Sequence, residues 1–492
     1  MKRNRNNSSN SSKAVRSLTI EEIDNEIIDC PDIIRKKVYL NGRKEACFYY
    51  IEGLVDKDLV ERDFIRPIIS MDFRNLANEK NVINISGTKV SVITDFETAI
   101  ANLFSGETLF ICNGLDFALS CLLLKFEKRS IDEPQTEKNI RGPHEGFIEA
   151  LTTNMAILRR RIKNKNLKFK SVKLGTTTTQ TVAIAYIDGI VNQQLLETLY
   201  NRIKAVNFDG ILANGYIEQV ITDFPNSPFP QYQATERPEK VTSALLEGKL
   251  AVILEGTPVV IIAPVSFFSF FQALDDYSSQ WINASFLRLL RISSLFVALF
   301  LPSLYIAITS FHYYAVPLNL LATLAESRAR VPFPPIIEVL ILEATVEMVR
   351  EASIRLPTYI GTSISVVAGL IIGQAAVEAG VVSNLLIVIV ASTAIASYVI
   401  PTYDMALAIR ILRFVFLIAS GIFGIIGIIV CISFFLAHVV TIESLGQPYY
   451  QPVMPFKPSD LKDTFVRAPF KFIKKRPSIA KPFDKTRGKN ND

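Results

Sequence analysis

Charged side chains recur at helical spacing inside an apolar stretch of the sequence, IIEVLILEATVEMVREASIRLP at 336–357. Glu343, Glu347 and Glu351 are four residues apart, so a helix would place them on one face together with Arg350. The opposite side of such a helix is apolar. The spacing therefore predicts an amphipathic helix over 336–355, whose acidic face could meet cations or basic partner groups.

This helix does not resemble a membrane span, because each charge near the centre of a lipid-surrounded helix costs about 3 kcal/mol. Glu351 and Arg355 can pair at i,i+4, but the other carboxylates repel one another. Two interpretations stay open. In one, the helix lies at the membrane surface or against another domain, where arginines such as Arg328 and Arg330 neutralise it. In the other, its acidic face meets water at a cation pathway or a subunit junction.

A stripe of small residues follows the charged helix. At 100° per residue, Thr362, Ser365, Gly369 and Gly373 fall on one side of a helix, and the two glycines form a GxxxG motif. Small residues in lipid usually allow close helix packing, and the alternative is a polar stripe that lines a water-filled path. Glycines also recur every third residue in the last apolar stretch, at Gly421, Gly424 and Gly427.

Motifs of known enzyme chemistry are missing from the sequence. It contains no GxxxxGK[ST], HExxH, GxSxG or dinucleotide fingerprint. Its five cysteines have no metal-ligand spacing and are expected to be buried free thiols, and the three histidines have no ligand-like neighbours. We therefore expect no enzyme, no cofactor and no metal site. The basic run at 159–173 lacks interleaved aromatic residues, so we expect no nucleic-acid partner either.

Four uncharged apolar stretches have the length of membrane spans. Only 20% of the 492 residues are charged, and the apolar residues concentrate between 286 and 442. About 20 apolar residues cross a bilayer as a helix. The predicted spans lie near 292–311, 359–377, 381–400 and 414–437. A transmembrane domain over 286–442 is therefore expected.

Basic residues around these spans predict the orientation of the chain. The segment 443–492 is rich in Lys and Arg, and its KFIKKRPSIAK run should lie on the cytoplasmic side near anionic lipid. Arg288 and Arg291 place the preceding region on the same side. Both ends are then cytoplasmic, which requires an even number of crossings. Arg410 and Arg413 would lie outside, against this rule.

The region before the spans contains an internal repeat. YIEGLVDKDLVE at 50–61 matches YIDGIVNQQLLE at 186–197, and LFSGETLFICNG at 103–114 matches LLEGKLAVILEG at 245–256. The two matches occur in the same order at similar separations, which predicts two related α/β subdomains. We place them at 26–130 and 179–280, after a disordered polar tail at 1–25 and on either side of a helical, basic connector at 131–178. The expected fold is an α/β cytoplasmic region of two tandem subdomains, followed by an α-helical transmembrane bundle of about four spans plus an amphipathic helix.

Four long blocks of the sequence resemble a known family. They are NLLATLAESRARVPFPPIIEVLILEATVEMVREASIRLP at 319–357, RGPHEGFIEALTTNMAILRRRI at 141–162, FPQYQATERPEKV at 229–241 and IGTSISVVAGLIIGQAAVEAGVVS at 360–383. These blocks resemble the GerA family, the A subunits of bacterial spore germinant receptors. The likeness covers roughly residues 40–450.

The resemblance implies a multi-pass protein of the inner spore membrane with both termini in the cytoplasm. It implies a complex with a B subunit and a C subunit, and assembly as a homo-oligomer in a lipid membrane. The complex would respond to nutrients and trigger germination by forming or gating a cation pathway. Candidate residues for that pathway or for subunit contacts are Glu343, Glu347, Glu351, Thr362, Ser365, Gly369 and Gly373.

Two other functions remain compatible with the sequence. The chain could be a non-conducting membrane scaffold or signalling subunit that anchors its partners. It could also be a related membrane protein that amplifies germination. A transporter fits less well, because the four spans contain no evident inverted repeat.

Overall fold

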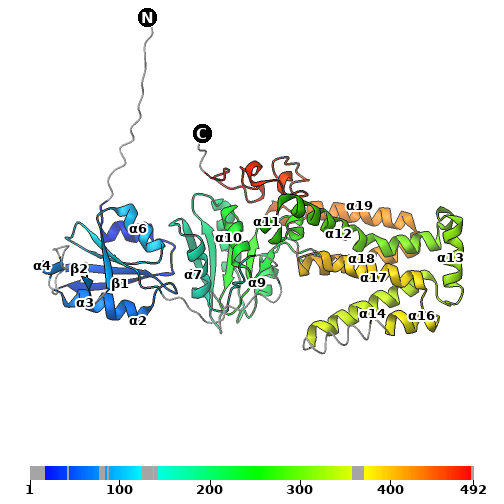
Figure 1. The fold of residues 1–492 in the computed structure, drawn as a ribbon, viewed down its shortest axis with the longest axis horizontal. Coiled ribbons are helices and arrows are strands. Elements are labelled where there is room, and N and C mark those ends of the chain that lie inside the picture. Colours follow the sequence, from blue (N-terminus) through cyan, green and yellow to red (C-terminus); the bar gives the residue numbers. More distant parts are fainter. Residues whose placement is uncertain are drawn as a thin grey trace, which may run out of the picture. The chain divides into compact units, whose positions relative to one another are not determined.

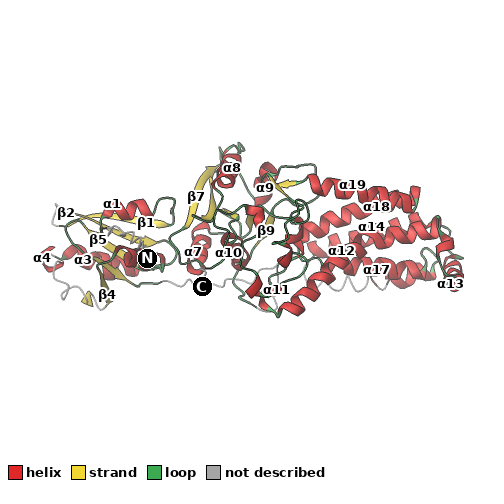
Figure 2. Cartoon of the chain, turned by 90° about the horizontal axis from the view of Figure 1, so that it is seen from above, coloured by secondary structure: helices red, strands yellow, loops and turns green. Residues whose placement is uncertain are grey.

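The computed structural model describes residues 17–40, 44–71, 73–76, 84–85, 88–124, 137, 142–356, 369 and 371–488. The chain divides into two compact units. The first contains Met1–Pro134, Glu145–Ile217 and Thr235–Ile261, and the second contains Gln135–His144, Glu218–Ala234 and Ile262–Asp492. The first unit carries most of the β-structure, and the second is mainly helical (Figures 1 and 2).

The first α/β subdomain consists of one β-sheet and several short helices. Its sheet has the order β1-β2-β5-β6-β4-β3 and is antiparallel wherever its register is defined. The strands are β1 (Ile33–Leu40), β2 (Lys44–Ile51), β3 (Asn84–Ile85), β4 (Thr88–Ile93), β5 (Thr108–Cys112) and β6 (Ala118–Cys121). The helices are α1 (Ile20–Glu26), α2 (Lys57–Leu59), a π-helical turn Val60–Ile65, α3 (Arg66–Ser70), α4 (Phe73–Leu76) and α6 (Phe96–Phe104).

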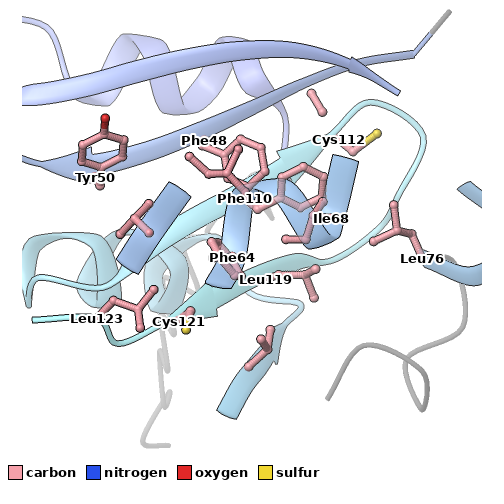
Figure 3. Packing of buried hydrophobic residues seen from close by; sticks show 14 of the residues in the cluster. Phe48, Tyr50, Phe64, Ile68, Leu76, Phe110, Cys112, Leu119, Cys121 and Leu123 are labelled. Atoms are coloured by element: carbon pink, nitrogen blue, oxygen red, sulfur yellow. The ribbon is translucent and has the colours of Figure 1, made fainter. Parts of the chain in front are cut away.

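Side chains alternate between the two faces of this sheet, and both faces are buried. Phe48 and Phe110 pack on Phe64 and Ile68 of the short helices on one face (Figure 3). Tyr49, Ile111 and their neighbours pack on α1 and α6 on the other face. Because successive strand residues point to opposite sides, adjacent residues such as Phe48 and Tyr49 serve two separate cores.

The second subdomain repeats this arrangement. Its sheet has the order β7-β8-β10-β11-β9. The strands are β7 (Leu167–Leu174), β8 (Gln180–Ile187), β9 (Gln233–Thr235), β10 (Leu250–Leu254) and β11 (Val260–Ala263). The helices are α7 (Leu151–Arg161), α8 (Gln193–Lys204), α9 (Asn214–Ile221) and α10 (Pro238–Leu246).

The matching sequence segments occupy equivalent positions in the two subdomains. After the β1–β2 and β7–β8 hairpins, Gly53 and Gly189 turn the chain with φ angles of +83° and +78°. The side chains of Asp56 and Asn192 then cap the next helix by accepting backbone N–H groups. The turns that lead into β5 and β10 also match, because Glu107 and Lys249 each donate a backbone hydrogen bond five residues back. The structure therefore contains the internal repeat that the sequence predicts.

The boundary of the second subdomain differs from the prediction. The expected connector at 131–178 includes α7 and β7, and β7 pairs along its whole length with β8. Its sequence LKFKSVKL contributed to the basic run of the connector that we expected to be helical. The lysines alternate with the buried residues Leu167 and Phe169, so the run is an edge strand with its charges outward.

The second unit is a set of long helices followed by a folded C-terminal segment. The helices are α11 (Asp275–Ser278), α12 (Trp281–Ser310), α13 (Leu318–Arg328), α14 (Pro335–Arg355), α16 (Ala376–Glu378), α17 (Asn384–Val399), α18 (Tyr403–Phe423) and α19 (Ile425–Thr441). A π-helical turn, Ile371–Ala375, precedes α16. Short 3-10 helices lie at Phe267–Phe271, Tyr313–Ala315, Leu461–Asp463, Phe470–Phe472 and Ser478–Ala480, and two short strands are β12 (Glu443–Ser444) and β13 (Gln447–Pro448). In both views α12, α14, α17, α18 and α19 extend along a common direction (Figures 1 and 2).

Two of these helices, α12 and α18, are long and apolar enough to cross a membrane, while α17 and α19 are apolar but shorter. The predicted span at 292–311 falls almost entirely within α12, and the one at 381–400 corresponds to α17. Most of the span at 359–377, including Thr362 and Ser365, lies outside the described residues. A bundle of four spans is therefore not established by the part of the chain that the structure describes.

The predicted single span at 414–437 is wrong. The chain turns at Gly424, with φ +61° and ψ −138°, so the apolar run is shared between α18 and α19. A side chain at Gly427 would collide with the backbone oxygen of Ala419, which shows how closely the two helices approach after the turn. Hydropathy could not reveal this break, because the residues on both sides of the turn are equally apolar.

Four of the five cysteines are buried free thiols and Cys431 is half-buried, as the sequence predicts. Burial raises the pKa of Cys30 and Cys112, and burial with the nearby Glu107 and Asp63 carboxylates raises the pKa of Cys121 to about 11. A raised pKa keeps a thiol protonated at neutral pH and therefore unreactive.

A buried ion pair joins the two subdomains of the first unit. Arg159 of α7 donates from Nε and Nη2 to the carboxylate of Asp32, at 2.7 and 3.0 Å, and from Nη1 to the backbone oxygen of Leu167 at 2.7 Å. The rings of Phe104 and Phe169 lie near the guanidinium group, 4.9 and 5.1 Å from its carbon. Since Asp32 immediately precedes β1, this contact fixes the first sheet to α7 and β7 of the second subdomain.

Replacing Arg159 with Met should separate the two subdomains. The substitution leaves the Asp32 carboxylate buried without its cation, which costs about 3–5 kcal/mol. Amide hydrogen exchange in β1 and β7 should accelerate accordingly in the full-length protein. Lys36→Met is the matched control on β1, because it removes an exposed pair with Glu61 that contributes about 0–1 kcal/mol. Equal exchange rates in the two variants would contradict this role of Arg159.

Candidate functional site: an ion-pair network on helix α14

The helix predicted at 336–355 is α14, Pro335–Arg355. Pro335 occupies its first turn, where a missing N–H is tolerated, and the helix ends at Leu356, the residue before Pro357. Its buried residues include Glu338, Val339, Leu342, Glu343 and Arg350. Its exposed residues are Ile337, Ile341, Ala344, Met348, Glu351, Ile354 and Arg355. The charged residues Glu338, Glu343 and Arg350 are thus turned into the protein, and the outward side combines apolar residues with the charged pair Glu351 and Arg355.

Two arginines of α18 neutralise the buried carboxylates. Arg413 lies 3.0 Å from Glu343 and 2.9 Å from Glu347, and Arg410 lies 2.8 Å from Glu347. The contact with Glu343 has the distance of an ion pair but not the angles of a hydrogen bond, whereas Arg413 and Arg410 both donate to Glu347. The side chains of Glu343 and Arg413 are each 1% exposed. A carboxylate this deeply buried is stable only beside a cation.

Arg350 extends the network to α17. Its guanidinium group lies 3.5 Å from Glu347 and donates to the hydroxyl groups of Ser397 and Tyr398, at 3.0 and 3.2 Å. The ring of Tyr398 also lies 4.4 Å from the guanidinium carbon, within cation–π range. The residues Glu343, Glu347, Arg350, Arg410 and Arg413, which we call the α14 network, therefore join three helices.

The remaining charges of α14 are paired separately. Arg328, one of the two expected partners, lies 3.1 Å from Glu338, which also accepts the backbone N–H of Ser383 at 3.2 Å. Glu351 pairs with Arg355 at 2.6 Å, and both side chains are more than half exposed. Glu351 is thus the candidate carboxylate of α14 that stays at the surface of the single chain, paired within its own helix, while Glu343 and Glu347 contact arginines of α18.

These contacts change the interpretation of α14. We expected that charges would exclude it from lipid, but that cost applies to uncompensated charges on a lipid-facing side. Here the charges of the α14 network face α17 and α18, and Ile341 and Met348 face outward with 42% and 64% exposure. Apolar residues outside and paired charges inside suit a helix in a membrane.

The glycines of the small-residue stripe border a cavity next to the network. Gly369 and Gly373 line a space of about 310 Å³ together with Arg350, Tyr398 and apolar residues of α14 and α17. A side chain added at either glycine would meet none of the described residues within 4 Å. Close packing against the described residues therefore does not explain these two glycines. Gly421 differs, because an added side chain there would collide with Ile336 of α14.

Sequence reasoning missed Arg410, Arg413 and Tyr398. Their signal was present, since two arginines three residues apart interrupt an apolar run and conflict with the expected orientation. The described residues contain no group of three or more His, Cys, Asp or Glu side chains that could hold a metal ion.

Comparison with known proteins identifies the family of the chain. The family model described as Bacillus/Clostridium GerA spore germination protein matches residues 21–479. The chain belongs to the GerA family. This result confirms the resemblance carried by the sequence blocks, and the matched region includes both subdomains and the whole α14 network.

Individual relatives of this GerA protein are similar over most of their length. Spore germination protein KA of Bacillus subtilis (strain 168) is 38% identical over 475 residues, which cover 95% of this chain and 87% of the relative. The uncharacterized membrane protein YfkQ of the same organism is 39% identical over 453 residues, which cover 91% of this chain and 88% of the relative. A crystal structure of the N-terminal domain of the A subunit of the Bacillus megaterium spore germinant receptor GerK3 matches with 29% identity and a TM-score of 0.41, and covers 52% of this chain and 99% of that chain.

Removing one charge of the α14 network should destabilise this GerA protein strongly. Arg413→Met leaves Glu343 buried without a cation, so the free energy of unfolding should fall by about 3–5 kcal/mol. Combining it with Glu343→Gln should restore part of the loss, because the unpaired charge is then removed. The measurement is denaturant unfolding in detergent. The exposed pair is the control, and Glu351→Gln should change stability by at most about 1 kcal/mol. Additive effects of the two network substitutions would contradict direct pairing.

Two glycine substitutions should distinguish a glycine that packs against the backbone from a glycine that borders open space. Gly427→Ala places a methyl group against the backbone oxygen of Ala419, so stability should fall by about 1–3 kcal/mol. Gly373→Ala meets no atom of the described residues within 4 Å and should leave the unfolding midpoint of the detergent-solubilised protein nearly unchanged. Comparable losses in both variants would show that Gly373 packs against another part of the protein.

Proposed function

We propose that this GerA protein is the A subunit of a nutrient germinant receptor in the inner spore membrane. In this proposal it acts with a B and a C subunit, carries no enzymatic activity and needs no cofactor. The observation that carries the proposal is the α14 network, which places paired charges between apolar helices of a family member. Such a network suits a membrane protein that changes conformation, since ion pairs in an apolar setting favour a few discrete helix arrangements.

We also propose four crossings, by α12, α17, α18 and α19, with both termini in the cytoplasm. The lengths of α17 and α19, 16 and 17 residues, are close to the lower limit of about 17 residues for a span. A contact between the two ends of the helical region supports an even number. Ser285 in the second turn of α12 hydrogen-bonds to both the backbone oxygen and the backbone N–H of Arg467, which follows α19.

The cation pathway in this proposal forms between copies of the chain. The outward stripe of α14 begins with Ile337 and Ile341, continues to Met348 and ends with the Glu351–Arg355 pair. In a symmetric ring these stripes would surround the axis and make an apolar constriction next to a ring of exposed Glu351 carboxylates, each paired with Arg355 of its own helix. Apolar constrictions gate by excluding water, and carboxylate rings favour cations.

A non-conducting scaffold is the second candidate function. The pairing of Glu343 and Glu347 with Arg410 and Arg413 favours it, because these carboxylates are then unavailable to a passing ion. In that case the α14 network would only hold the helices together, and partner subunits would carry any flux.

Flux measurements in liposomes distinguish the two functions. The protein is reconstituted with its B and C subunits, and nutrient-dependent cation flux is recorded for the native chain and for Glu351→Gln. The proposed pathway predicts flux with reduced cation selectivity in the variant, because the ring of exposed carboxylates is removed. Glu197→Gln, which changes an exposed carboxylate in the first unit, is the control and should behave as the native chain.

The other outcomes are equally informative. No flux in any oligomeric preparation would support the scaffold and contradict the conducting role. Flux with unchanged selectivity in Glu351→Gln would contradict the α14 stripe as the lining of the pathway. Cross-linking in the same liposomes should give a closed ladder of copies if a ring forms.

A further inference from the structure

The segment after α19 is folded and fixed to the start of α12. Tyr449 is fully buried, and its hydroxyl group donates to the backbone oxygen of Pro230. Asp460 accepts hydrogen bonds from the backbone and the hydroxyl group of Ser478, at 2.8 and 2.6 Å. Ile479 and Ala480 are buried. Figure 1 draws this segment in red beside the beginning of α12.

A second buried ion cluster sets the position of this segment along α12. Arg288 is fully buried and lies 3.2 Å from Asp276 and 3.0 Å from Asp463 of the C-terminal segment. Arg291 lies 2.8 Å from Asp276, and Tyr277 donates to Asp463 at 2.9 Å. These contacts lie within the first three turns of α12, at the end where its apolar membrane-length stretch begins.

Aromatic residues mark the same level of α12 as the edge of a membrane. Trp281, the single tryptophan of the chain, opens α12 with 43% exposure, and Phe286 is 64% exposed one turn later. Tryptophan concentrates at the membrane–water interface, where one side of its ring is apolar and the other is hydrated. The C-terminal segment is therefore held close to the depth of the lipid headgroups.

The surface of the segment has the composition that such a depth favours. Its exposed lysines are Lys457, Lys462, Lys471, Lys474, Lys475, Lys481 and Lys485. Its exposed phenylalanines are Phe456, Phe470, Phe472 and Phe483, with 61–85% exposure. Exposed aromatic rings are costly in water, but they enter the headgroup region readily, and lysines attract anionic lipids.

We propose that residues 453–487 form a docking surface for the anionic phospholipids of the membrane that α12 enters. The lysines bind lipid phosphate groups, and the phenylalanines insert at the boundary of the acyl chains. The Arg288–Asp463 contact holds this surface at the required depth, so lipid charge and the position of α12 become coupled. This inference is independent of nutrient recognition and of ion conduction.

The test places a fluorescent reporter in the segment of the full-length chain. Phe472→Trp in a Trp281→Phe background makes residue 472 the sole tryptophan. The protein is placed in nanodiscs of phosphatidylcholine alone or mixed with phosphatidylglycerol, with bromine atoms on the acyl chains. The proposal predicts a blue-shifted emission that the bromine atoms quench in the anionic discs, and loss of this quenching at high salt, because salt screens the lysine–lipid attraction.

Charge variants complete the test. Changing Lys471, Lys474 and Lys475 to Gln should abolish the quenching in anionic discs. Changing Lys163, Lys173 and Lys204 to Gln is the control, because it removes three exposed lysines from the first unit and should have no effect. Equal quenching in both types of disc would overturn the role of anionic lipid. Emission at the water-exposed wavelength in every disc would overturn docking altogether.

Discussion

The pairing of Glu343 and Glu347 with Arg410 and Arg413 is the contact on which the helical unit depends. Each of these side chains, if left alone in an apolar setting, would cost several kcal/mol in lost hydration. When they are paired, these side chains fix the position of α14 along α18. Arg350 fixes the position of α17 by donating a hydrogen bond to Ser397. A shift of one helix by a turn would leave charges unpaired, so the helices are confined to arrangements that keep the pairs.

Buried ion pairs of arginine also occur at two other contacts between segments of the protein. Arg159, Arg288 and Arg413 are among the largest fully buried side chains of the described residues. Arg159 joins the two α/β subdomains, and Arg288 joins α11, α12 and the C-terminal segment. Buried ion pairs add little net stability, but they disfavour alternative packings strongly because one misplaced partner leaves a bare charge. The protein thus uses arginines where separate segments must meet in one register.

Local features of the fold were predictable from the sequence, and long-range partners were not. The Gly53 and Gly189 turns and the Asp56 and Asn192 caps depend on neighbouring residues, so repeated segments revealed them. The bounds of α14 followed from helical periodicity and from Pro357. The partners of Glu343 and Glu347 lie more than 60 residues away, and nothing in the local pattern selects them over Arg328 or Arg330. The turn at Gly424 was hidden because hydropathy records composition and not direction.

The net charge of the α14 network affects where a cation could pass. Three arginines and two glutamates leave one net positive charge, since 3 − 2 = 1, among the residues Glu343, Glu347, Arg350, Arg410 and Arg413. A buried site with a positive excess repels a cation unless a pair opens first. The exposed stripe carries the Glu351–Arg355 pair, whose charges cancel, so it has no positive excess. A cation pathway through a GerA oligomer is therefore more compatible with the outer face of α14 than with its charged inner face. The inner face instead holds α14 against α17 and α18.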